Sequence, residues 1–161
     1  RKEITFLFKL IKDYFNKEIN NLVKNDIKIN ILGNLKPLPK KIRQCLIKSM
    51  SRTKNSRKII VNLAINYGSK YEILNSQKQL IRKKMSISFK NFEKNLYTKD
   101  FPHPDFLIRT GGEKRLSNFL LWQLAYSELY FVKKLWPDFN VSDYTKIIKN
   151  FKRVKRNFGN I

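Results

Sequence analysis

The sequence predicts an α/β protein in which helices flank a parallel sheet. Segments with apolar residues at helical spacing alternate along the chain with short apolar or β-branched runs, which is typical of this class. Those runs end at turn-forming residues, namely Gly33-Asn34, Asn66-Tyr67-Gly68 and Gly111-Gly112. At 161 residues the chain can bury a core, so we expect a single domain over residues 1–161.

The first half of the chain is predicted to contain two helices and two strands. Apolar residues from Ile4 to Val23 recur at helical spacing and give one broad apolar face. Ile27, Ile29 and Ile31 alternate with polar residues, as in a half-buried strand. A helix over residues 42–50 and a β-branched strand over residues 58–65 complete this half.

The second half repeats the alternation with shorter elements. Residues 71–83 return to helical spacing, and residues 105–109 form a short apolar strand before the Gly-Gly turn. The apolar residues after Ser117 predict another helix, and residues 130–132 a last short strand. Ser142 is the expected N-cap of the final helix.

The composition is strongly basic. Thirty-five Lys and Arg against 12 Asp and Glu give a formal net charge of +23. The charges are scattered rather than gathered in one run, which fits a lysine-rich surface around an anionic substrate. A polyanion or an anionic membrane surface as partner stays open as the alternative.

The numbers of cysteine and histidine residues and the hydropathy exclude several other classes of protein. Cys45 is the single cysteine, so no intrachain disulfide forms and a reducing compartment is expected. One Cys and one His do not make a zinc site. No apolar run approaches the roughly 20 residues of a membrane span.

The segment from Pro104 to Phe139 carries the densest chemical signal. Phe106-Leu107-Ile108 ends in Arg109 and the Gly-Gly turn, and Arg115 and Ser117 follow. Ligands bind at the carboxyl ends of strands in open α/β sheets, and guanidinium groups can grip phosphate oxygens in pairs. The sequence therefore predicts a diphosphate site at this strand end.

The same segment contains the motif RTGGE-x-RLSNFLLWQ-x-AY-x-ELYF, followed by LWPDF. It resembles the C-terminal signature of cis-prenyltransferases, and most of all that of bacterial undecaprenyl diphosphate synthase. Weaker similarity covers IIVNLAINYG at residues 59–68, the helical residues 2–25 and the basic segment FKRVKRNFG at residues 151–159. The family's opening Asp-Gly-Asn-Gly-Arg-Trp motif does not occur in these 161 residues. We therefore expect the chain to lack the N-terminal part of the enzyme, including the family's catalytic Asp.

The resemblance implies roles for particular residues. It assigns Arg109, Arg115 and Ser117 to the diphosphate of isopentenyl diphosphate and Glu128 to Mg²⁺, the expected cofactor. A salt bridge to one of the many cations is the alternative for Glu128, because a buried carboxylate needs a partner. Asn66 is expected either to orient substrate or to cap its turn.

Two positions depart from the family pattern. Lys114 replaces a common His, and Ser69 replaces the commoner second Gly after Asn-Tyr-Gly. A protonated Lys cannot ligate a metal as His does, although it can still offset the charge of a diphosphate.

The expected function is cis-prenyl transfer from an allylic diphosphate to isopentenyl diphosphate, giving a long polyprenyl diphosphate. The helix over residues 4–23 would form one wall of the product tunnel, and the enzyme would be a homodimer in the cytoplasm. Peripheral membrane contact stays open, and no nucleic acid is expected. The alternatives are a basic RNA- or membrane-surface-binding module without catalysis and a non-catalytic partner subunit.

Overall fold

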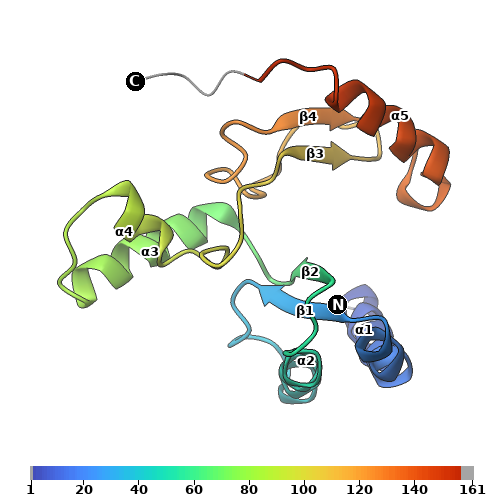
Figure 1. Ribbon diagram of the computed structural model, residues 1–161. Helices are drawn as coiled ribbons and strands as arrows, with labels where there is room; N and C mark the ends of the chain where they lie inside the picture. The colour runs from blue at the N-terminus through green and yellow to red at the C-terminus, as the bar shows by residue number, and fades with distance from the viewer. Residues whose placement is uncertain (1, 157–161) are drawn as a thin grey trace. The chain divides into compact units, whose positions relative to one another are not determined.

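The computed structural model describes residues 2–156 and divides the chain into two compact units, residues 1–67 and 68–161. Each unit is an α/β arrangement built on one pair of parallel strands (Figure 1). The prediction of parallel strands flanked by helices is therefore confirmed, with the four strands forming two separate pairs. The assignment of the whole chain to a single domain stays a prediction.

The first unit follows the predicted order of elements. It contains α1 (Lys2–Lys24), β1 (Ile27–Leu32), α2 (Lys40–Arg52) and β2 (Ile59–Ala64). The register runs from Ile27 opposite Ile59 to Leu32 opposite Ala64. Asp26 joins the two strands where they begin, because its carboxylate accepts from the backbone N–H groups of Arg57 and Lys58, both at 2.9 Å.

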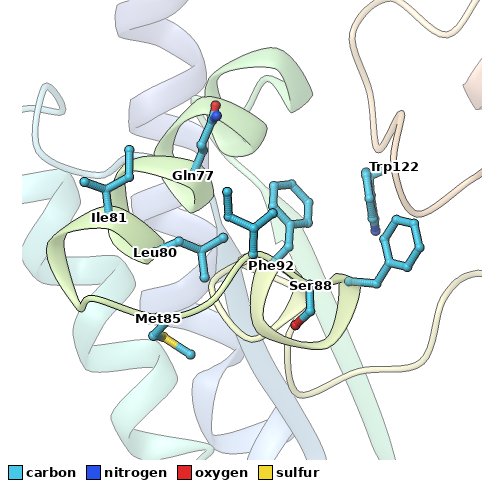
Figure 2. A pocket seen from close by; sticks show the side chains of 9 residues that line it. Gln77, Leu80, Ile81, Met85, Ser88, Phe92 and Trp122 are labelled. Atoms are coloured by element: carbon cyan, nitrogen blue, oxygen red, sulfur yellow. The ribbon is translucent and has the colours of Figure 1, made fainter.

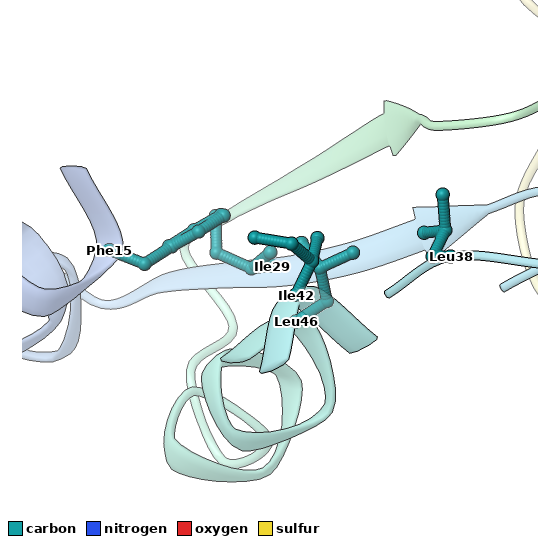
Figure 3. Close-up of a cluster of buried hydrophobic side chains, with 5 residues drawn as sticks. All are labelled: Phe15, Ile29, Leu38, Ile42 and Leu46. Atoms are coloured by element: carbon teal, nitrogen blue, oxygen red, sulfur yellow. The ribbon is translucent and has the colours of Figure 1, made fainter. Parts of the chain in front are cut away.

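The core of the first unit lies between β1, α1 and α2. Figure 3 shows the five buried side chains that form it: Phe15, Ile29, Leu38, Ile42 and Leu46. Each side chain of this size contributes about 1.5–3 kcal/mol when it leaves water. Cys45 packs against this cluster, and burial raises the pKa of its thiol despite the opposing charge of Lys12. It therefore packs against the core and is not an activated nucleophile.

The second unit contains shorter elements joined by longer turns. They are α3 (Ser69–Arg82), α4 (Phe89–Glu93), β3 (Phe106–Arg109), β4 (Glu128–Phe131), the 3₁₀ helix η1 (Trp136–Asp138) and α5 (Val141–Phe151). The strands β3 and β4 are parallel, with Phe106 opposite Glu128 and Arg109 opposite Phe131. The helix α5 packs on this pair through the rings of Phe106 and Phe151, whose centroids lie 5.1 Å apart.

Two local predictions in the second unit are wrong. The N-cap of α5 is Asn140 and not Ser142, because Asn140 and Asp143 form a reciprocal capping box. The helix predicted from Ser117 does not form, and residues 117–126 make consecutive turns instead. In the closing basic segment, residues 157–159 lie outside the described part of the chain. Among the described helices, none is both long and apolar enough to cross a membrane.

Candidate active site

The loop after β3 is fixed by glycine conformations and by backbone hydrogen bonds. Gly111 and Gly112 have φ angles of +90° and +79°, which a side chain would disfavour. Their N–H groups donate to the carbonyls of Lys134 and Val132 at 2.8 and 2.9 Å. The loop therefore stays attached to the segment after β4 and leaves the strand end in one defined direction.

The predicted arginines and serine meet on this loop. The Nη1 of Arg109 donates to the carbonyl oxygen of Arg115 and, at 3.0 Å, to the Oγ of Ser117. The guanidinium of Arg115 forms a close ion pair with Glu113. Arg109 is half-buried and Arg115 is exposed, so one cation is held in place while the other faces solvent. The nine residues from Arg109 to Ser117 thus carry two guanidinium groups and a hydroxyl, the donors that suit a phosphate group.

The backbone after Arg115 takes an unusual path. Ser117, Asn118 and Leu120 have φ angles of 47°, 62° and 44°, in the left-handed region. Three such residues within four positions end any helical ladder, which is why the predicted helix is absent. The turn instead displays the hydroxyl of Ser117 beside Arg109.

Glu128 is not brought to this cluster. It begins β4 opposite Phe106, whereas Arg109 ends β3 three residues further along the parallel pair. At 3.2–3.4 Å of rise per residue, the two backbones lie about 10 Å apart along the strands. Among the described residues, no Lys, Arg or His side chain lies within 4.0 Å of the Glu128 carboxylate, so the salt-bridge alternative is absent here. The described part of the chain also holds no group of three His, Cys, Asp or Glu side chains able to bind a metal.

Asn66 belongs to the first unit. Its side-chain Nδ2 donates to the carbonyl of Asn34 at 2.7 Å, and its own carbonyl accepts from the Asn34 N–H at 3.3 Å. Its φ angle of 49° is one that asparagine tolerates better than most residues. The structure therefore shows Asn66 as the cap of its turn, and a contact with substrate stays a prediction.

An apolar groove of about 550 Å³ lies along the first unit. Its walls come from α1, β1 and β2, and the lining residues are Leu10, Ile11, Tyr14, Phe15, Leu22, Ile27, Ile29, Val61 and Leu63. On α1, Phe15 is buried in the core while Leu10 and Tyr14 are about half exposed. The role of this helix as a wall of the product tunnel stays a prediction. The groove can accommodate a hydrocarbon chain.

A second apolar recess, also of about 550 Å³, lies in the second unit. Figure 2 shows Leu80, Met85, Phe92 and Trp122 around it, contributed by α3, α4, the link between them and the turns after Asn118. The Trp122 Nε1 donates to Glu93 at 3.1 Å, which fixes the indole ring. Phe89 stands at the rim of this recess, 78% exposed.

Three residues of the site were not predicted from sequence. Glu113 pairs with Arg115, and its position directly after the Gly-Gly turn was a usable signal. Asn118 and Ser69 hydrogen-bond to each other's segments, 49 positions apart in the chain. No local sequence pattern reveals that pairing. Lys114, which departs from the family pattern, is exposed on the loop.

The fold and the loop define a class of protein, an α/β protein that presents a basic loop at the carboxyl end of a parallel strand. The comparisons with known proteins make this class specific. A family model described as "Putative undecaprenyl diphosphate synthase" matches residues 1–159. The chain belongs to this prenyltransferase family.

Relatives in sequence and in structure agree with this assignment. An isoprenyl transferase from Oceanobacillus iheyensis is 36% identical over 168 residues, covering 100% of this chain and 67% of the relative. One from Fusobacterium nucleatum is 42% identical over 160 residues, covering 99% and 69%. The chain thus spans about two-thirds of the length of these relatives.

Two solved structures share the fold. The crystal structure of a probable undecaprenyl diphosphate synthase from Campylobacter jejuni matches with a TM-score of 0.90 and 36% identity, covering 99% of this chain and 76% of that one. Lavandulyl diphosphate synthase from Lavandula x intermedia, in complex with dimethylallyl diphosphate, matches with a TM-score of 0.92 and 29% identity, covering 99% and 72%.

Proposed function

We propose that the protein takes part in cis-prenyl transfer, in which isopentenyl diphosphate is condensed repeatedly onto an allylic diphosphate such as farnesyl diphosphate. The product would be a long polyprenyl diphosphate such as undecaprenyl diphosphate. The observation that carries the proposal is the convergence of Arg109, Arg115 and Ser117 on one loop of a prenyltransferase-family fold.

In each condensation the double bond of isopentenyl diphosphate attacks the allylic carbon, and the allylic diphosphate leaves with the electrons of the broken C–O bond. Loss of a proton then forms the new Z double bond. We assign the loop to the diphosphate that is retained, because a fixed guanidinium and a hydroxyl orient it without taking part in bond changes. The groove beside α1 would hold the growing hydrocarbon.

Magnesium is the proposed cofactor, and Glu128 is the residue proposed to hold it. Mg²⁺ prefers oxygen ligands and is commonly bound by one or two carboxylates together with phosphate oxygens, which fits a carboxylate that pairs with no cation among the described residues. When bound, the ion would neutralise charge on a departing diphosphate. Since Glu128 lies about 10 Å along the strands from Arg109, it would serve the allylic diphosphate rather than the one on the loop.

A second copy of the chain is the proposed protein partner. Two apolar side chains that line the recess are themselves largely exposed, because Phe89 is 78% exposed and Ile87 is 91% exposed. The exposed side chains of one copy could enter the recess of a second copy and the reverse, which is the self-complementary contact that a twofold interface requires. We propose a homodimer that works in the cytoplasm on diphosphate substrates and does not require nucleic acid.

The diphosphate site is tested by calorimetric titration, which measures the affinity of the protein for isopentenyl diphosphate. Arg109→Ala and Arg115→Ala should each weaken binding by about 10- to 100-fold, because a hydrogen bond to a charged group contributes about 1.5–3 kcal/mol. Lys114→Ala is the comparison variant: it removes one charge from the same loop but no guanidinium, so it should weaken binding less than either arginine variant does. Equal affinity in the wild type and both arginine variants would refute the assignment.

The metal proposal is tested separately. Glu128→Gln keeps the shape of the side chain and removes its charge, so the active enzyme should need more Mg²⁺ or turn over more slowly. A Mg²⁺ dependence identical to that of the wild type would make Glu128 structural.

The 161 residues by themselves should make no polyprenyl product, because the family's opening Asp-Gly-Asn-Gly-Arg-Trp motif does not occur in them. Radiolabelled isopentenyl diphosphate with farnesyl diphosphate and Mg²⁺ is the assay. Butanol-extractable product would contradict this expectation.

A further inference from the structure

The first turn of α3 is capped by a residue that lies far away in the sequence. The first N–H groups of a helix have no partner within the helix. Here the N–H of Ser69 donates to the main-chain carbonyl of Asn118, and the N–H of Lys70 donates to its side-chain Oδ1, both at 2.8 Å. Gly68, the N-cap residue itself, provides no side-chain cap. Asn118 therefore takes the role that an N-cap side chain normally plays.

The helix start in turn accepts a hydrogen bond from the turn that contains Asn118. The Oγ of Ser69, which is fully buried, accepts from the backbone N–H of Leu121 at 3.0 Å. Gly68 allows the close approach, because a Cβ at this position would lie 2.8 Å from the Nδ2 of Asn118. The helix start and the turn thus exchange three hydrogen bonds across a sequence separation of about 50 residues.

The turn needs this support. Ser117, Asn118 and Leu120 all have left-handed backbone conformations, which non-glycine residues adopt at a cost. Conformations of this kind persist where surrounding contacts fix them. Asn118 is fixed from both its oxygens, and the residue next to it, Ser117, accepts the hydrogen bond from Arg109.

We propose that Asn118 and Ser69 are positioning residues, which hold Ser117 and, through it, the guanidinium of Arg109 in the geometry that grips a diphosphate. This inference rests on the proposed function of the loop. It also gives the serine at position 69 a specific purpose. A glycine there would have no hydroxyl for Leu121, so the turn would lose one of its three anchors.

The experiment measures the affinity of the protein for isopentenyl diphosphate together with backbone amide exchange. Ser69→Ala removes the acceptor for Leu121, and Asn118→Gly removes the side-chain acceptor while keeping a backbone that tolerates positive φ. Ser76→Ala is the matched control. Ser76 is also fully buried on α3 and donates its own hydrogen bond, at 2.7 Å to the carbonyl of Phe92, which lies outside the turn.

Ser69→Ala and Asn118→Gly should each weaken diphosphate binding by about 3- to 10-fold, the equivalent of one lost hydrogen bond. The amide of Leu121 should exchange faster in Ser69→Ala, and that of Lys70 in Asn118→Gly. Ser76→Ala should lower stability by a similar amount without changing diphosphate affinity. Asn118→Asp, which keeps an acceptor for Lys70, should restore binding relative to Asn118→Gly.

Three other outcomes would overturn the inference, and they show whether the proposed function fails with it. Suppose that Arg109→Ala weakens binding but Ser69→Ala and Asn118→Gly bind as tightly as the wild type. The contacts between Ser69 and Asn118 are then only structural, and the inference is overturned. The inference also fails if Ser76→Ala weakens binding as much as Ser69→Ala does. If Arg109→Ala has no effect, the proposed diphosphate site is wrong, and the positioning role is wrong with it.

Discussion

Replacing Thr53 with valine should weaken the first unit by removing one buried hydroxyl. Thr53 is fully buried at the end of α2, and its Oγ1 accepts from the backbone N–H of Ile29 at 3.0 Å. The same hydroxyl donates to the carbonyl of Ser49 at 2.9 Å. Valine has the same shape but offers no acceptor, so the N–H of Ile29 in β1 would lose this partner.

The expected size of the effect follows from two opposing terms. A buried donor left without its partner costs about 1–3 kcal/mol. Exchanging the hydroxyl for a methyl group returns less than about 1 kcal/mol of apolar burial. The net loss of unfolding free energy should therefore be about 1–2 kcal/mol. With a urea dependence of about 2 kcal/mol per molar, the middle of the usual range, the unfolding midpoint should fall by about 0.5–1 M.

Urea unfolding followed by far-UV circular dichroism, with amide exchange at Ile29, is the assay. Trp122 and Trp136 both lie in the second unit, so tryptophan fluorescence reports separately on that unit. Thr53→Ser keeps the oxygen and should retain protection at Ile29. If Thr53→Val unfolds at the wild-type midpoint with Ile29 still protected, the hydroxyl does not stabilise β1 and the reasoning is wrong.

Three further predictions concern other parts of the fold. Gly33→Ala should destabilise the first unit by more than about 2 kcal/mol in the same urea assay, because φ is +126° and a Cβ would lie 2.2 Å from the backbone carbonyl oxygen of Ile65. Gly111→Ala should cost less stability, because its added Cβ would meet no other part of the chain within 4 Å. The Lys134 ammonium holds the pKa of Asp143 below its usual value, so this carboxylate stabilises the fold above its unfolded pKa and loses that effect as pH falls through the folded pKa. The stability advantage of the wild type over Asp143→Asn should therefore vanish in acid, and an advantage independent of pH would contradict it. Phe89→Asp should convert the proposed dimer to monomer in light scattering, and an unchanged mass would exclude this face.

Local sequence patterns were sufficient for most elements. Helical spacing placed α1 and α3 to within two residues, and the alternation of Ile27, Ile29 and Ile31 located β1. These patterns work because burial of one face selects a single period along the chain. The grouping of Arg109, Arg115 and Ser117 also followed from sequence, since one short loop joins them.

Asn140 shows where a readable signal was missed. Both Asn140 and Ser142 are good N-cap residues, but only Asn140 is followed three positions later by an acidic side chain, Asp143, that can close a capping box. The prediction of Ser142 considered only the residue type at the N-cap and ignored the acidic residue three positions later.

The sequence by itself determined the α/β class, the order of the elements in the first unit and the basic loop at the end of β3, because each depends on residues that are close together in the chain. Only the tertiary structure decided the path after Ser117. The spacing of Leu120, Leu121 and Leu124 suits a helix, yet the oxygens of Asn118 are bound to the start of α3, and the backbone there is left-handed. Three hydrogen bonds between segments about 50 residues apart fix this path, and no local pattern contains them.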